Sequence, residues 1–188
     1  GRFLMAGDNI LEVRVSRKLL LVLTVVGLLF LLAGLEIGYF QKIVGPDFTG
    51  DKVIVKWLFL FFSVICGGAI FINCLVYLFV PLLLLKVTPE KITFGTGLRY
   101  NPFEVSARFV EKAESFTKQS DLEVNGKRET VDGGAFLYLK NDPSIPAQLT
   151  TSMGIKYSNF KLEVESRYAD LSGPEIAQRT KAILGLKN

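Results

Sequence analysis

The sequence predicts a two-helix transmembrane hairpin followed by a small, mainly-β domain of about seven antiparallel strands, a partly open barrel capped by one C-terminal α-helix. Three observations lead to this fold class. Two long apolar segments come first, at 19–40 and 58–80. Short alternating segments separated by turn residues fill the second half of the chain. A single amphipathic segment ends it.

Composition divides the 188 residues into two parts. Hydrophobic residues make up 49% of the chain, and segment 19–85 is almost wholly apolar. Segment 86–188 holds 15 of the 22 Lys and Arg residues and 13 of the 18 Asp and Glu residues, so its net charge is only +2. Because these cations are dispersed rather than clustered, nucleic acid is not an expected partner.

The side chains needed for common catalytic and metal sites are scarce. The chain has no histidine, and its two cysteines, Cys66 and Cys74, lie about 12 Å apart on a helix, too far for a disulfide. Ser-His-Asp, Cys-His and Cys/His zinc sites are therefore excluded, and no phosphate-binding G-x-x-x-x-G-K-[ST] motif occurs. We expect no cofactor and no metal. Asp, Glu, Lys and Tyr can still catalyse, but no catalytic constellation is recognisable, and we expect a protein that is not an enzyme.

The two apolar segments have the length of membrane-spanning helices. Segment 19–40 has 22 residues with one charge, Glu36, and segment 58–80 has 23 residues without a charge. Each exceeds the roughly 20 residues that cross a bilayer core. A buried core helix is the alternative, and two uncharged runs of this length argue against it. A cleaved signal peptide is disfavoured because the first run is too long and lacks an A-x-A site.

The distribution of Lys and Arg predicts the orientation of this hairpin. Seven Lys and Arg residues lie before the first segment or just after the second, and three lie in the loop that connects the two segments. By the positive-inside rule both termini are cytoplasmic. The predicted organisation is a cytoplasmic segment at 1–18, helices at 19–40 and 58–80, a short outer loop at 41–57, and a cytoplasmic domain at 81–188.

Small and polar residues inside the spans predict how the two helices pack. Small side chains let membrane helices approach closely. The candidate packing residues are Gly27, Gly34, Gly38, Gly67 and Gly68. Packing of the two spans against each other is one interpretation of this pattern, and formation of a homo-oligomer is the other. Thr24 and Asn73 fall at similar depth, which predicts a hydrogen bond between them. Glu36 lies about a turn from the outer end, where it can reach water.

The second half reads as a series of short strands. Expected strands are 82–87, 92–94, 98–100, a segment from about 108, 122–131 as a hairpin, 135–140, 148–151 and 160–168. Asn125-Gly126 is the strongest turn signal because it supplies the positive φ angles of a type I′ turn. Glu163 and Glu165 fall on the polar face of the last strand, where a solvated face is expected. Asp132, Gly133 and Gly134 predict a turn that breaks the chain.

A helix is predicted at the C-terminus. Ser172 can cap it, with Glu175 three residues later and Pro174 in the first turn. Ile176 and Ile183 lie near one helix face. Such a helix can close the open end of a curled sheet.

Three segments carry a resemblance to a known group of proteins. They are VSRKLLLVL, which opens the first span, PLLLLKVTPEKITF, which follows the second, and ADLSGPEIAQRTKAIL at the end. Together with the strand pattern, they resemble small, uncharacterised bacterial inner-membrane proteins with two transmembrane helices and a C-terminal pleckstrin-homology-like domain. The resemblance implies a membrane-tethered binding module and supplies no catalytic residues. An OB-like barrel is the runner-up fold, and a helix after the last strand disfavours it.

Two functional hypotheses follow from different classes. In the first, the hairpin holds a non-catalytic module in the lipid bilayer, and an open sheet edge or the groove beside the terminal helix binds a protein or peptide. In the second, the protein senses lipid or a membrane surface through the candidate contacts Lys86, Lys91 and Arg99. The acidic residues Glu90 and Glu104 are mixed with these cations, which favours the first hypothesis.

Overall fold

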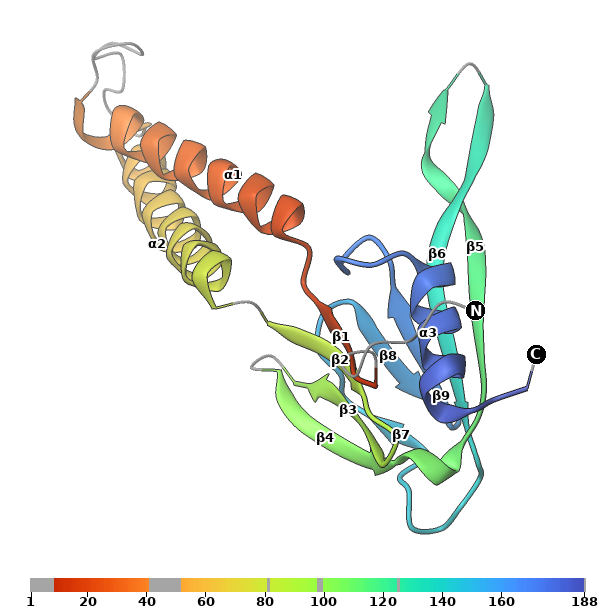
Figure 1. Cartoon of the computed structure of the whole chain (residues 1–188). Coiled ribbons are helices and arrows are strands. Elements are labelled where there is room, and N and C mark those ends of the chain that lie inside the picture. The colour runs from red at the N-terminus through yellow and green to blue at the C-terminus, as the bar shows by residue number, and fades with distance from the viewer. Residues whose placement is uncertain (1–8, 41–51, 81, 98–99, 125, 188) are drawn as a thin grey trace. The chain divides into compact units, whose positions relative to one another are not determined.

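The computed structural model describes residues 9–40, 52–80, 82–97, 100–124 and 126–187. The chain forms two compact units, of which one is Arg17–Pro81 and the other combines Gly1–Ser16 with Leu82–Asn188. The second unit is a β domain (Figure 1). It is therefore built from both sequence flanks of the helical unit.

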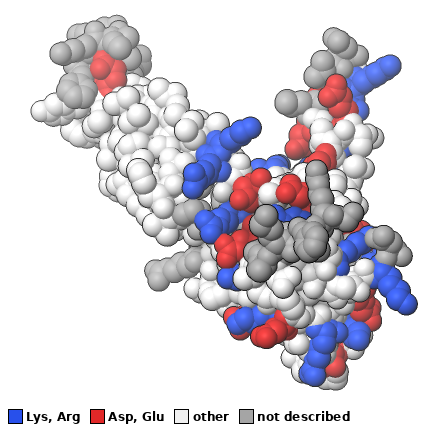
Figure 2. Space-filling model, viewed as in Figure 1, with Lys and Arg blue, Asp and Glu red and all other residues white. Residues whose placement is uncertain are grey.

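The helical unit consists of two long apolar helices. Helix α1 (Arg17–Leu35) continues into a π-helical turn, η1 (Glu36–Phe40), and helix α2 spans Lys52–Phe79. Both helices are long and apolar enough to cross a membrane, and most of their side chains are exposed. A core helix of a soluble protein would be mostly buried. Figure 2 shows an almost uniformly uncharged surface over this unit, which is the surface that a hydrocarbon environment accepts.

The first sheet pairs strands from both flanks of the helices. Its strands, in spatial order, are β1 (Leu11–Arg14), β2 (Leu83–Val87), β3 (Lys91–Thr96) and β4 (Asn101–Ser106). All neighbours are antiparallel. Leu11 lies opposite Val87 and Val13 opposite Leu85, and all four side chains are fully buried. The β1–β2 pair therefore joins the chain before α1 to the chain after α2.

The second sheet contains the predicted Asn-Gly hairpin. Its spatial order is β5 (Val110–Val124), β6 (Lys127–Leu139), β9 (Lys161–Glu165), β8 (Ile155–Ser158) and β7 (Gln148–Leu149). A 3-10 turn, η2 (Ala107–Phe109), connects β4 to β5. Val124 pairs with Lys127, and Gly126 has the positive φ of 73° that a tight hairpin turn requires. Asn125 lies outside the described residues.

Strand β6 continues through the two glycines at which a break was predicted. The register of the β5–β6 pair shifts between Phe116 and Thr117, which marks a bulge, and Gly134 has φ of 135°. A Cβ atom at Gly134 would collide with the carbonyl oxygen of Val164 on β9. Glycine is required at this position because the β9 backbone approaches so closely. Since β6 continues through both glycines, the prediction of a chain break was wrong.

The core lies between the two sheets and links them by aromatic contacts. The Phe94 side chain is 1% exposed, and its ring centroid lies 5.5 Å from the rings of Phe103 and Tyr157. Isolated bridges at Thr96–Thr151 and Val15–Ala169 connect the sheets at two further points. The first sheet and the second therefore fold as one hydrophobic unit.

Helix α3 (Gly173–Leu184) ends the described fold and packs against β5 and β6. The predicted cap is observed, because the Ser172 side chain accepts a hydrogen bond from the Glu175 N–H at 3.4 Å. The Asp132 carboxylate accepts two more, from the Gly134 N–H at 3.0 Å and from the Gly173 N–H at 2.7 Å. Asp132 thus ties the β6 bulge to the first turn of α3.

Two further features of the β domain differ from the sequence prediction. The described part of the chain has nine strands rather than about seven, and the unpredicted ones include β1 and β8. The expected strand at 160–168 is shorter in the structure, because Asn159 and Phe160 form a two-residue turn with φ of 51° and 58° before β9, and residues 166–168 form a turn after it. Asn159 tolerates a positive φ, whereas the same conformation costs about 1–2 kcal/mol at Phe160, and for this reason the sequence pattern placed Phe160 in the strand.

Candidate interaction surfaces

The cations expected to contact a membrane surface have carboxylate partners within the β domain. Lys86 Nζ lies 3.0 Å from a carboxylate oxygen of Glu12, and Lys91 Nζ lies 2.6 Å from one of Glu104. Arg99 lies outside the described residues. Hydrogen bonds from Arg14 and Lys86 hold the pKa of the Glu12 carboxyl below its usual value. These pairs reduce the positive charge that Lys86 and Lys91 can offer to anionic headgroups.

Four of the predicted packing glycines lie between α1 and α2. A Cβ atom at Gly27 would come within 2.8 Å of the Phe71 nitrogen, and one at Gly67 within 2.8 Å of the Leu31 nitrogen. Cβ atoms at the two remaining positions would meet the opposite helix as well; these are Gly34, against Ser63, and Gly38, against Leu60. The missing side chains let the two backbones approach.

Three of the predicted packing residues do not act as expected. A Cβ atom at Gly68 would meet nothing within 4 Å, so this glycine faces away from α1. The Thr24 hydroxyl donates to the Leu20 carbonyl and the Asn73 amide donates to the Ala69 carbonyl, each at 2.7 Å and each within its own helix. The predicted Thr24–Asn73 hydrogen bond is therefore replaced by bonds to the preceding turn, which need no second helix.

Glu165 is buried among cations, contrary to the solvated face that the alternation predicted. Its side chain is 9% exposed and lies 2.9 Å from Lys156 Nζ, 3.2 Å from Arg167 Nε and 3.9 Å from Lys118 Nζ. Burial alone raises the pKa of the Glu165 carboxyl, but the Lys156 hydrogen bond and the charges of all three cations outweigh it and hold the pKa below its usual value. This cluster joins β5, β8, β9 and the segment after β9, so its role is structural.

A row of aromatic side chains covers part of the second sheet. The Phe116 and Phe136 rings stack with centroids 4.0 Å apart, and Tyr138 lies 6.2 Å from Phe136. Lys161 Nζ sits 3.4 Å from the Phe136 centroid and 5.5 Å from that of Tyr138. All three rings are half-buried. The lysine already occupies the ring faces that a cationic ligand would need.

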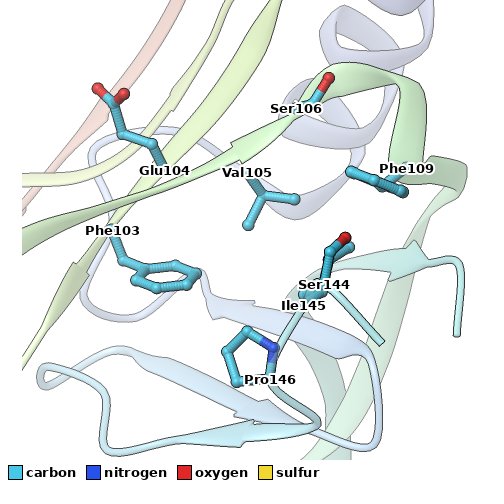
Figure 3. A pocket seen from close by; sticks show the side chains of 8 residues that line it. All are labelled: Phe103, Glu104, Val105, Ser106, Phe109, Ser144, Ile145 and Pro146. Atoms are coloured by element: carbon cyan, nitrogen blue, oxygen red, sulfur yellow. The ribbon is translucent and has the colours of Figure 1, made fainter. Parts of the chain in front are cut away.

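A half-open cavity of about 100 Å³, lined by apolar side chains and by polar atoms that include Ser144, borders strand β4 (Figure 3). Apolar side chains of β4, η2 and the 144–146 loop converge on it: Phe103, Val105, Phe109, Ile145 and Pro146. The side chains of Glu104 and Ser106, which also line it, point away from the space, so these two residues border it with their main chains. The cavity is smaller than the roughly 300–1,000 Å³ typical of small-molecule sites.

Strand β4 is the last strand of the first sheet, and its pairing shows which backbone groups remain unpaired. The Ala107 N–H donates to the Glu90 carbonyl at 2.8 Å. Since bonded pairs alternate in an antiparallel ladder, Val105 and Phe103 face β3, whereas Glu104 and Ser106 direct their N–H and C=O groups outward. The Ser106 carbonyl begins the η2 turn and accepts its first hydrogen bond, and the other outward groups have no hydrogen-bond partner among the described residues. Pro102, which lacks an N–H, falls at an outward position as well.

The described residues contain no group of three or more His, Cys, Asp or Glu side chains that could hold a metal ion. Comparisons of this chain with protein-family models, with curated proteins and with solved structures found no match.

Proposed function

We propose that this protein is a membrane-tethered, non-catalytic interaction module, in which two helices hold a pleckstrin-homology-like domain at the cytoplasmic face of a bacterial inner membrane for a protein or peptide partner. The observation that carries this proposal is the outer edge of β4, which has unpaired backbone groups beside a small cavity. An uncovered sheet edge is a template for a further strand. Two antiparallel sheets and a C-terminal helix are consistent with the pleckstrin-homology-like layout.

The two apolar helices and the β1–β2 pair support the tethering. Because β1 precedes α1 and β2 follows α2, their pairing requires both flanks to lie on the same side of any membrane that the helices cross. The excess of Lys and Arg on these flanks favours the cytoplasmic side. Anchoring at the membrane raises the local concentration of the domain near membrane-bound partners without any additional contact.

Sensing of lipid through juxtamembrane cations is the alternative, and it has less support. Lys86 and Lys91 pair with Glu12 and Glu104. Clusters of about four to eight cations are typical of anionic-lipid recognition. A homo-oligomer is a further possibility, since Gly68 leaves a small-residue position on α2 that faces open space.

Gentle detergent extraction of the tagged full-length protein tests the proposal. The full chain is needed because a fragment that starts at 82 would lack β1. We expect a different protein to co-purify in a fixed molar ratio. Purification as a lone monomer or homo-oligomer with retained anionic lipid would refute the proposal and support lipid sensing.

A further inference from the structure

We propose that the outer edge of β4 binds an extended segment of a partner protein, which adds a fifth strand to the first sheet, places an aliphatic side chain in the cavity and presents an acidic side chain to Arg108. This inference rests on the proposed function and specifies the chemistry of the partner. Its elements are the unpaired backbone groups of β4, the cavity, and an exposed cation.

The backbone of β4 determines the extended conformation of the partner. Glu104 directs its N–H and C=O away from β3, and Ser106, two residues later, directs its N–H the same way while its carbonyl begins the η2 turn. Only a strand presents donors and acceptors at this repeat, which is close to 6.8 Å. Pro102 and the η2 turn bound this stretch at its two ends, so the paired segment is short.

The cavity determines one side chain of the partner. Phe103 and Val105 alternate with Glu104 and Ser106 along β4, so the apolar side chains face the cavity and the polar ones do not (Figure 3). A volume of about 100 Å³ suits one aliphatic side chain better than an aromatic ligand or a cofactor. Burial of that side chain supplies affinity that a short set of backbone hydrogen bonds does not.

Charge complementarity determines the neighbouring side chain. The Arg108 guanidinium lies 4.8 Å from the centroid of Phe109, one of the rings that line the cavity. In the described part of the chain Arg108 has no carboxylate within ion-pair distance. Asp142, whose pKa is lowered mainly by hydrogen bonds from Ser144 and also by the charge of Arg108, already accepts from the Ser144 N–H at 2.8 Å and from its hydroxyl at 2.5 Å. Arg108 is therefore available to a carboxylate that follows the buried aliphatic residue.

The structure offers a matched pair of variants at Ser106. Its φ of −60° and ψ of 136° already suit proline, and its N–H has no partner among the described residues. Ser106→Pro therefore removes an outward donor and obstructs an added strand while the fold is retained. Ser106→Ala keeps the N–H and serves as the control. Hydrogen exchange of the β3 amides checks that both variants remain folded.

A displayed library of short random peptides, selected on the full-length protein in detergent, tests the inference. We expect selected peptides to share an aliphatic residue next to Asp or Glu. They should bind the Ser106→Ala protein as tightly as the unmodified protein. They should bind the Ser106→Pro protein about tenfold more weakly, because the loss of one hydrogen bond of about 1.4 kcal/mol lowers affinity by a factor of ten. Arg108→Glu should weaken them several-fold, and a peptide with Lys in place of the acid should recover binding to that variant.

Two results would overturn the inference: selection of no peptide, or selected peptides that bind Ser106→Pro and Arg108→Glu as tightly as the unmodified protein. If Ser106→Pro proves unfolded, the Arg108→Glu comparison decides alone. A protein that co-purifies in a fixed ratio with Ser106→Pro as well as with Ser106→Ala would leave the proposed function standing and contradict the β4 site. Absence of any co-purifying protein contradicts the proposed function itself.

Discussion

Replacing Glu165 by glutamine should destabilise the β domain by about 2 kcal/mol. The carboxylate accepts a hydrogen bond from Lys156 at 2.9 Å, forms an ion pair with Arg167 Nε at 3.2 Å, and has Lys118 Nζ at 3.9 Å. Hydrogen bonds to a charged group contribute about 1.5–3 kcal/mol each. The Lys156 and Arg167 side chains are 66% and 52% exposed, so water screens both contacts. Their combined stabilising free energy therefore stays near that of a single hydrogen bond to a charged group.

Glu163 supplies a matched control for this substitution. It lies two residues away on the same strand and has Lys156 at 3.9 Å with a side chain that is 25% exposed. Glu163→Gln should cost less than about 0.5 kcal/mol, as is usual for an exposed, poorly aligned ion pair. Hydrogen exchange of the β6 and β9 amides in the full-length protein measures the free energy of unfolding of the β domain apart from the helices.

The effect should also depend on pH in a definite direction. The pKa of Glu165 is lower in the folded state than its ordinary value near 4.5. Its contribution is therefore fully present above about pH 4.5, and it is lost as pH falls through the lowered folded-state pKa. The difference between Glu165→Gln and the unmodified protein should shrink in acid. Equal stability of the two glutamine variants at neutral pH, or a difference that grows on acidification, would refute the reasoning.

Three further predictions follow from close contacts and buried polar groups. Gly134→Ala should destabilise the β domain by about 3 kcal/mol or more, because φ is 135° and the new Cβ meets the Val164 carbonyl. Gly126→Ala, at the open hairpin tip, should destabilise it by about 1–2 kcal/mol. Hydrogen exchange of the β6 amides compares the two variants. Gly67→Leu should separate α1 from α2 and lower the melting temperature of the helices in detergent, measured by circular dichroism, whereas Gly68→Leu should not. Thr180→Val should stabilise the β domain by about 1 kcal/mol, because the buried Thr180 hydroxyl has no hydrogen-bond partner among the described residues. Denaturant unfolding measures this change, and a destabilisation would show that the hydroxyl does form a hydrogen bond.

The elements that the sequence predicted well are those with strong local signals. The two apolar runs have the length of spans, Asn125-Gly126 encodes a hairpin turn, and Ser172 with Pro174 marks the start of α3. Strand β1 was missed because LEVR is short and its pairing partner lies more than 70 residues away, beyond both helices. No local pattern reports such a distant partner.

The candidate sites were less accessible to sequence reasoning. No strand was expected at 101–106, where β4 lies, and which side of β4 remains unpaired depends on the order of the strands in the sheet. The Glu165 cluster was missed for a related reason, because Lys118 and Lys156 come from strands whose register is set by tertiary pairing. The contact of Arg108 with Phe109 is local, yet its position beside the cavity depends on Ile145 and Pro146.

The most direct test of the account is a cross-link between the two flanks of the helical hairpin in native membranes. Glu12 on β1 lies opposite Lys86 on β2, so cysteines at these positions, with Cys66 and Cys74 replaced by alanine, should be joined within one chain by a short bifunctional thiol reagent. Cysteines at Glu12 and Glu104 lie on strands about 14 Å apart and should not be joined. Failure to link the first pair would contradict the claim that both flanks build one domain on one side of the membrane.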